Sequence, residues 1–261
     1  MSKPGLVLPR RRFLQAMLTA PLLLQAGRAL AEGGDEQQGP PPQGPMAAVA
    51  ERYAALKSYS DTGTVTTDYQ WPDTPLTTEH HRFETAFRAP RNFFFRFDQD
   101  EAAGGDIYVI WCDGGPFQSW WKATGVHDVW DGGRGVTAFI TGDSSTKGAA
   151  NLIPPYFFQQ ALLYGPTLRL LNVAEAGDDT VAGHACRKIT ATGRETGVQT
   201  TETRPIAIWI DSESGLVRKA VLAEADGSPT GLIDKTTYTV DPAADPELTD
   251  DRFTFTPPSG G

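Results

Sequence analysis

The chain has 261 residues, of which 39% are hydrophobic and 21% are charged, and its formal net charge is −9. These proportions exclude a chain that is disordered throughout, and they favour one globular domain of the larger all-β kind. Removal of the first 31 residues takes away five basic residues and leaves 18 basic against 32 acidic ones, a net charge of −14. Such an acidic surface disfavours nucleic acid and anionic lipid headgroups as partners.

The N-terminus has the features of an export signal. Three arginines, Arg10–Arg12, precede an apolar run that ends near Leu24 and is too short to cross a bilayer. The arginines and the two residues after them also match the twin-arginine pattern. We expect cleavage after Ala31, so that residues 1–31 are a signal peptide and the mature protein is soluble in the periplasm or otherwise exported, without a transmembrane anchor. Residues 32–45, rich in Gly, Pro and Gln, are expected to form a disordered tether.

The domain that follows the tether begins with an amphipathic helix. Apolar side chains recur at helical spacing over residues 45–59, and Asp61-Thr62-Gly63 is expected to end the helix, with a first strand over 64–71. Further strands are predicted where apolar and polar residues alternate between turn residues, over 82–88, 92–98, 106–112, 117–122 and 126–130. Glycines between these short strands indicate an antiparallel meander.

An insert interrupts the strands over residues 131–165. It contains glycines and small residues and then an apolar stretch, in which Pro155 is expected to begin a helix that ends at Gly165. This insert has more apolar surface than a short connection needs, so we expect it to pack on the sheet.

The hairpin over residues 205–222 is the clearest prediction in the second half. Its three isoleucines, at 206, 208 and 210, share one face of the first strand, and Asp211–Gly215 supplies the turn. Other strands are expected over 173–175, at 181, and over 185–192, 200–203, 232–240 and 253–256. The sequence thus predicts a mainly β (α+β) fold for residues 46–261. Its curved antiparallel sheet of about ten strands forms an open half-barrel, covered by the N-terminal helix and the helical insert.

The order of these elements resembles one known superfamily. The segments that carry the resemblance are ERYAALKSYSDTGTV, ETAFRAPRNFFFRF, YVIWCDGG, VAGHACRKI, IWIDSESGLVRKAVL and FTFTPP, which occur in this order between Met46 and Pro258. Each is a generic strand or turn signal, and their succession is what resembles the periplasmic LolA/LolB-like lipoprotein-localisation proteins and related outer-membrane lipoprotein-sorting proteins. The chain looks like an uncharacterised relative of this group.

The resemblance implies a half-barrel with a helical lid and a hydrophobic cavity for acyl chains. Carriers of this group hold the lid shut with an arginine inside the cavity, and Arg88 and Arg96 both lie in suitable strands. The side chains expected to line the cavity are apolar residues of the strands and the insert: Phe93, Phe95, Phe97, Trp111, Trp120, Leu152, Ile153, Phe157, Phe158 and Leu162. A filled core would give the same sequence pattern as a ligand cavity.

Three functions are compatible with these observations. The first is an exported soluble binding protein that shelters a lipid, a lipoprotein acyl chain or a similar hydrophobic ligand. The second is a sensor or scaffold of the cell envelope that acts through protein contacts. The third is a serine hydrolase, because Ser144 and Lys147 fit the pattern Ser-x-x-Lys, but the other elements of such enzymes are missing. The sequence therefore does not support an enzyme.

Cysteines and histidines give no cofactor signature. Cys112 and Cys186 are the only cysteines, and they form either a disulfide or two buried small hydrophobic residues. The adjacent His80 and His81 would point to opposite faces of a strand, and no histidine has metal-ligand spacing. We expect no metal and no cofactor.

Overall fold

The computed structural model describes residues 44–99, 105–130, 145–158, 168–195, 203–223 and 233–258. The chain divides into two units, Met1–Glu36 and Gln37–Gly261, and every described residue lies in the second unit. The expected signal peptide and most of the expected tether fall outside the described residues. Within the described ranges, no helix combines the length and the hydrophobicity needed to span a bilayer.

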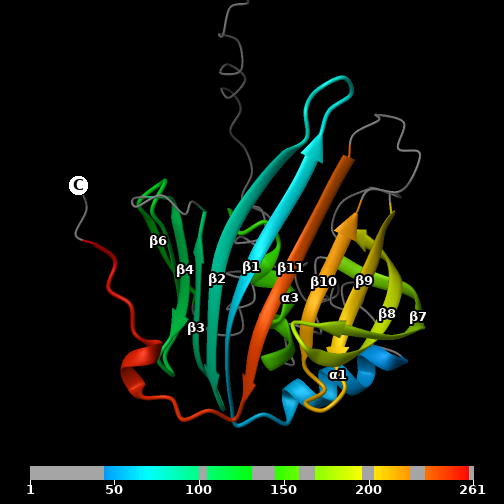
Figure 1. Cartoon of the computed structure of the whole chain (residues 1–261). Coiled ribbons are helices and arrows are strands. Elements are labelled where there is room, and N and C mark those ends of the chain that lie inside the picture. The colour runs from blue at the N-terminus through cyan, green and yellow to red at the C-terminus, as the bar shows by residue number, and fades with distance from the viewer. Residues whose placement is uncertain are drawn as a thin grey trace, which may run out of the picture. The chain divides into compact units, whose positions relative to one another are not determined.

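The second unit is built on eleven strands. In chain order they are β1 (Ser58–Gln70), β2 (Thr77–Arg88), β3 (Asn92–Asp98), β4 (Ile107–Cys112), β5 (Phe117–Trp121), β6 (Val126–Trp130), β7 (Leu168–Val181), β8 (His184–Glu195), β9 (Thr203–Asp211), β10 (Val217–Ala223) and β11 (Ile233–Ala244). They form one sheet in the order β6-β5-β4-β3-β2-β1-β11-β10-β9-β8-β7. Each half of the chain is thus a meander, and the first and last strands, β1 and β11, pair antiparallel and join the two halves (Figure 1).

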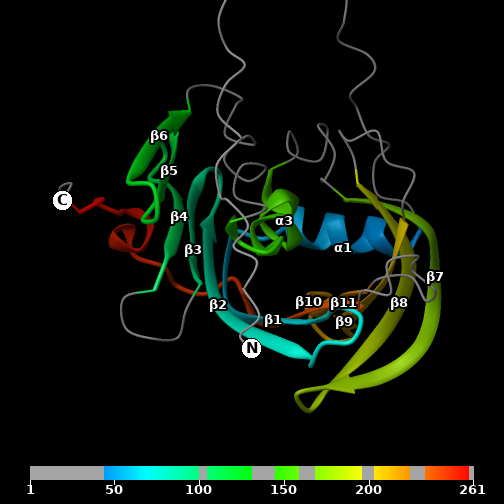
Figure 2. The same ribbon diagram turned by 90° about the horizontal axis from the view of Figure 1, so that it is seen from above.

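Few helical segments accompany the sheet among the described residues. They are α1 (Pro45–Ala54), α3 (Ala149–Leu152) and two 3-10 turns, η2 (Pro154–Phe157) and η3 (Asp250–Phe253). Proline occupies the first turn of α1, where its missing N–H costs nothing, and Met46, Val49 and Tyr53 bury one side of this helix. Figure 2 shows the sheet curving around α1 and α3. The predicted fold, an open antiparallel half-barrel with few helices, is confirmed.

Several element boundaries differ from the prediction. β1 and β2 begin at Ser58 and Thr77, earlier than expected, and β7 is one strand over Leu168–Val181 where two short ones were expected. The helix ends at Ala54, and Asp61-Thr62-Gly63 lies inside β1, because β1 pairs along its length with both β2 and β11. Residues 253–256 are not a strand: Phe253 ends the 3-10 turn η3, and Phe253 and Phe255 pack against the sheet. In the insert, α3 precedes the expected helix start at Pro155, and Pro155 itself lies in the short 3-10 turn η2. Residues 131–144 and 159–165 lie outside the described ranges.

The sheet has two faces that bury different clusters, because side chains alternate along each strand. We call the face that packs on α1 and residues 145–158 the inner face, and the opposite one the outer face. The inner cluster includes residues of β1–β5 and β8–β11. The outer cluster is smaller and centres on Phe94, Trp111, Trp120 and Phe253.

Candidate ligand-binding face

Aromatic rings dominate one half of the inner face. Phe93, Phe95 and Phe97 are alternate residues of β3 and are completely buried. The register of β2 against β3 places Phe87 beside Phe93 and Phe83 beside Phe97. The rings therefore lie in rows across neighbouring strands and give this part of the inner face a continuous apolar surface.

A glycine makes room for one of these rings. Gly63 of β1 lies directly opposite Phe83 of β2, and a Cβ built at Gly63 would fall 2.1 Å from the tip of the Phe83 ring. The ring therefore lies flat on the backbone of β1, where any side chain would displace it.

Residues 145–158 and α1 cover the apolar rows. The Phe157 ring stacks on Phe87 with 4.6 Å between centroids, and lies 4.9 Å from Tyr59 and 5.7 Å from Tyr53 of α1. The Phe158 ring meets Phe87 edge-on at 5.6 Å. These contacts place the aromatic pair of the insert against the centre of the inner face.

Most of the residues expected to line a cavity do lie together on the inner face. Phe93, Phe95, Phe97, Ile153 and Phe157 belong to the inner cluster. The partly buried residues that pack against this cluster include Leu152 and Phe158. Leu162 lies outside the described residues.

The prediction that Trp111 and Trp120 line the inner face is wrong. Trp111 and Trp120 belong to the outer cluster, where both rings contact Phe255 of the C-terminal segment. Their neighbours Cys112 and Trp121 point inward instead. Period-two alternation was correct for β4 and β5, but alternation alone does not say which of two buried faces a residue occupies.

Neither arginine considered for a lid contact serves that purpose. Arg88 donates to the Leu248 carbonyl at 3.0 Å and pairs with Asp250, both in the C-terminal segment on the outer face. Arg96 pairs with Asp98 on the same strand, 2.9 Å away.

One carboxylate lies within the apolar part of the inner face. Asp61 of β1 is 3% exposed, and its Oδ2 accepts a hydrogen bond from the Tyr59 hydroxyl at 2.8 Å. Its Oδ1 and the hydroxyl of Thr85, directly opposite on β2, are buried without hydrogen-bond partners among the described residues. Burial raises the pKa of Asp61 to about 7, although the hydrogen bond from Tyr59 acts to lower it.

A polar cluster lies where β1 ends and β2 begins, which we call the hairpin end of the inner face. Glu79 accepts a hydrogen bond from the Tyr69 hydroxyl at 2.7 Å and pairs with Lys147 of the insert, Nζ to Oε2, at 3.1 Å. The Nε2 atom of His81 lies 3.5 Å from the same oxygen. Sequence reasoning missed this cluster because it joins two segments far apart in the chain.

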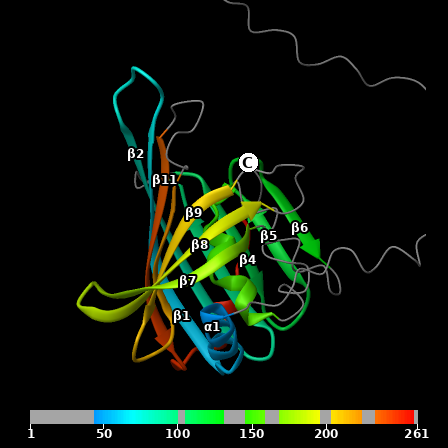
Figure 3. The same ribbon diagram turned by 90° about the vertical axis from the view of Figure 1, so that its right-hand side faces the viewer.

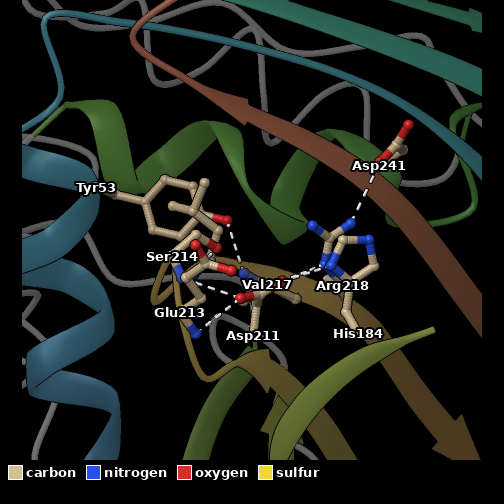
Figure 4. A network of polar contacts seen from close by, with 9 residues as sticks. Tyr53, His184, Asp211, Glu213, Ser214, Val217, Arg218 and Asp241 are labelled. Carbon is tan, nitrogen blue, oxygen red and sulfur yellow. Dashed lines mark hydrogen bonds and ion pairs between the residues drawn. The ribbon is translucent and has the colours of Figure 1, made fainter. Parts of the chain in front are cut away.

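The remaining polar network fixes the predicted hairpin (Figure 4). The Asp211 carboxylate accepts hydrogen bonds from the backbone N–H groups of Glu213 and Ser214, both at 2.9 Å. It also accepts a hydrogen bond from Arg218 Nε at 2.5 Å. Arg218 also reaches Asp241 of β11 at 3.2 Å. Burial acts to raise the pKa of Asp211, but the Ser214 N–H, Arg218 and the Glu213 N–H outweigh it and lower this pKa to about 2. The network stabilises the turn.

The two cysteines are free buried thiols, so the disulfide alternative is not realised in this structure. Cys112 points inward from β4, whereas Cys186 of β8 lies opposite Asp211 and shares its outer face. The six strands β3, β2, β1, β11, β10 and β9 lie between them in the sheet.

Metal-ligand and hydrolase patterns remain unsupported. Within the described ranges, no group of three or more His, Cys, Asp or Glu residues could hold a metal ion. Ser144 lies outside the described residues, and Lys147 of the same pattern is engaged by Glu79.

No family model matches the chain, and no curated protein matches it. Solved structures with a similar fold are found at low identity. LprF from Mycobacterium bovis is 10% identical with a TM-score of 0.42, over 81% of this chain and 97% of that one. The lipoprotein LppX from Mycobacterium tuberculosis is 16% identical with a TM-score of 0.38, over 76% of this chain and 91% of that one.

A LolA superfamily protein from Nitrosomonas europaea is similar as well. It is 11% identical with a TM-score of 0.32, over 83% of this chain and 99% of that one. At such identities the likeness concerns the fold and does not extend to ligands.

Proposed function

We propose that the protein is an exported soluble binding protein that shelters a lipid, a lipoprotein acyl chain or a similar hydrophobic ligand on the inner face of its half-barrel. One observation carries the proposal. The rings that cover Phe87 and Tyr59 belong to Phe157 and Phe158, which come from a segment inserted between β6 and β7 and not from the sheet itself. An acyl chain that replaced these rings would meet the same aromatic rows.

The energetics of such an exchange are favourable in order of magnitude. Each methylene removed from water contributes about 0.8 kcal/mol, so about ten methylenes contribute about 8 kcal/mol. This gross value corresponds to about micromolar affinity before the cost of displacing the insert is subtracted. Ligands with long chains are therefore expected to bind, and chains of a few carbons are not.

The first experiment is extraction of the mature protein, residues 32–261, purified from its native envelope without detergent. Mass spectrometry of the extract should show a stoichiometric lipid, and the stripped protein should take up a fluorescent fatty acid. A protein that is empty and also ignores the added fatty acid would contradict the proposal.

Two adjacent residues of β3 provide a matched control. Phe95 points to the inner face and Phe94 to the outer face, and both are buried. Substitution of either by alanine should destabilise the fold by about 3–5 kcal/mol, because each leaves a ring-sized cavity. Phe95→Ala should also change the affinity for the fatty acid by about tenfold, the equivalent of 1.4 kcal/mol. Phe94→Ala should leave the affinity of the folded fraction unchanged.

A second candidate function, an envelope scaffold that binds another protein, is favoured by one other feature. The β1–β2 hairpin extends past the neighbouring strands (Figure 3), and Trp71 and Leu76 at its tip are 58% and 55% exposed. Large exposed apolar side chains are typical of docking sites. A tight protein partner that is recovered without lipid and lost in Trp71→Ser would favour this function over ligand binding.

Export is part of the proposal. We expect cleavage after Ala31, so that N-terminal sequencing of the protein recovered from the periplasm should begin at Glu32. Recovery of the full chain from the cytoplasm alone would contradict it.

A further inference from the structure

The inner face changes from apolar to polar along the direction of its central strands. Near α1 the cross-strand row joins Phe87 of β2 with Tyr59 of β1. Four residues closer to the hairpin end of β2, Phe83 lies opposite Gly63. At the hairpin end the inward positions become polar: Thr67, Tyr69, Glu79, His81 and Thr236. A long ligand whose chain lies on the aromatic rows would place its other end among these polar groups.

Three groups from different parts of the chain converge on one carboxylate at the hairpin end. The Tyr69 hydroxyl donates to Glu79 Oε1, while Lys147 Nζ and His81 Nε2 lie 3.1 and 3.5 Å from Oε2. The Tyr69 hydrogen bond is the largest cause of the lowered pKa of Glu79. The cluster is therefore arranged to stabilise a negatively charged oxygen pair.

One ring nitrogen of His81 lies near Glu79 without a well-formed hydrogen bond among the described residues. Its Nδ1 lies 2.5 Å from the carbonyl oxygen of Gln99, and since a carbonyl only accepts, Nδ1 carries the hydrogen. The Nε2 atom is buried and has no hydrogen-bond partner among the described residues, and the whole residue is 7% exposed. Nε2 therefore faces the place where the Glu79 carboxylate now lies.

Lys147 is held in position and still has donors to offer. Its backbone carbonyl accepts a hydrogen bond from the Tyr238 hydroxyl at 2.6 Å, which fixes this residue over β11. Its ammonium group has three N–H donors, and the side chain is 39% exposed. Glu79 is 34% exposed, so its carboxylate can rotate toward solvent and leave the Tyr69 hydroxyl and the Lys147 ammonium group as donors.

We propose that this cluster binds the acidic headgroup of an amphipathic ligand, whose carboxylate or phosphate oxygens replace the Glu79 carboxylate between Tyr69, His81 and Lys147. The inference rests on the proposed ligand-binding function and adds the chemistry of the headgroup and the orientation of the chain. The ligand lies with its apolar chain toward α1 and its head at the hairpin end.

The acidic character of the whole protein does not prevent this binding. Surface charges are screened beyond about 10 Å at 0.1 M salt, so the groups in contact with the headgroup decide its affinity. The nearby Arg204–Asp234 pair, at 3.4 Å, contributes no net charge.

The test compares ligands that share a chain and differ in the head. Oleate, oleoyl lysophosphatidic acid and the neutral oleyl alcohol are titrated into stripped protein, residues 32–261, by displacement of a neutral fluorescent lipid probe. The wild-type protein should bind both acids about tenfold more tightly than the alcohol, as expected for charge-assisted hydrogen bonds. The relative affinities of oleate and the lysophosphatidic acid distinguish a carboxylate head from a phosphate head.

Variants of the cluster give opposite expected shifts. Lys147→Met should weaken both acids about tenfold and leave the alcohol unchanged. Glu79→Gln should strengthen the acids, because it removes the competing carboxylate. Lys235→Met, the same substitution at an exposed position on the outer face of β11, should change the affinity neither for the acids nor for the alcohol. Circular dichroism checks that each variant is folded.

Each other outcome overturns a defined part of the argument. Equal binding of acids and alcohol, unaffected by Lys147→Met, would refute the headgroup site and leave the proposed function intact. Weaker binding of acids to Glu79→Gln would also refute it, because Glu79 would then be an acceptor for a ligand hydroxyl or amine. Failure of all three ligands to bind would refute the proposed function and this inference together.

Discussion

The inner and outer clusters take side chains from the same strands, yet they are covered in different ways. The outer cluster is covered by residues 245–258, which continue directly from β11. Arg88 pairs with Asp250 and lies 5.0 Å from the Phe253 ring centroid, and Arg252 bonds Glu84 at 2.6 Å. Ion pairs and cation–π contacts thus fasten this cover at several points.

The cover of the inner cluster is a separate inserted segment. Its described aromatic contacts are ring against ring, and its ion pair, Lys147 to Glu79, joins two half-exposed side chains. Hydrogen bonds from Gln99 and Tyr238 to the carbonyls of Ser145 and Lys147 also hold it. Exposed or half-exposed ion pairs contribute about 0–1 kcal/mol. The ion pairs of the outer cover are equally exposed, so the difference lies in its cation–π contacts. It fits the proposed function, in which a ligand replaces the inner cover and the outer cover stays in place.

The largest expected effect on stability comes from removing one aromatic ring from each cover. Phe253 is completely buried, and Phe253→Ala should lower the free energy of unfolding by about 3–5 kcal/mol. Phe157→Ala should cost less, because Phe157 is 8% exposed and its segment can adjust. Urea unfolding measures both values.

Ligand binding distinguishes the covers further. Phe157→Ala should raise the affinity for a long-chain fatty acid, because less protein surface has to be displaced, while Phe253→Ala should leave the affinity of the folded protein unchanged. If Phe253→Ala altered the affinity as much as Phe157→Ala did, the distinction between the two covers would be lost.

The strands of both faces could be predicted from sequence because the alternation is local. The hairpin over residues 205–222 is the best example: Ile206, Ile208 and Ile210 are all in the inner cluster, and the turn lies at Asp211–Gly215 as expected. The half-barrel follows from the order of such strands, and β1 and β11 close the central pairing.

The assignment of residues to a face could not be predicted in the same way. Where both faces of a strand are buried, as in β4, alternation does not tell which set of side chains faces inward. The prediction that Trp111 faces inward is therefore wrong. The end of the helix failed because long-range pairing of β1 overrides the local turn signal at Asp61-Thr62-Gly63. The contact of Glu79 with Lys147 depends on how the insert folds back, which no local pattern encodes.

Two carboxylates on opposite faces supply the next test. Asp61 on the inner face has its pKa raised to about 7 by burial, whereas Asp211 on the outer face has its pKa lowered to about 2. A raised folded pKa means that the charged form is penalised: the penalty is absent below the unfolded value of 3.8, grows as the pH rises to about 7, and is constant above.

Asp61→Asn should therefore raise the free energy of unfolding by about 2–4 kcal/mol at pH 8 and by much less at pH 4. Asp211→Asn should lower the free energy of unfolding at pH 8, because it weakens the ion pair with the buried Arg218. The difference in stability between this variant and the wild type should shrink as the pH falls from 3.8 toward 2. Urea unfolding at several pH values measures both. An Asp61→Asn variant with the same gain at pH 4 and pH 8 would show that Asp61 is not the titrating group.

The smallest expected effect concerns the contact of Phe83 with Gly63 on the inner face. Gly63→Ala places a Cβ inside the Phe83 ring position, so the ring must rotate within a packed cluster, and the expected cost is about 1–3 kcal/mol. The same change should disturb the aromatic rows without affecting the outer cover.

If the cost arises from the ring, Gly63→Ala in a Phe83→Leu background should cost less than in the wild type, because the shorter side chain leaves room. A coupling of about 1 kcal/mol in this double-mutant cycle is expected for residues in direct contact. Additive effects would instead attribute the cost to the backbone of β1, and Phe83 would then be free to move aside for a ligand.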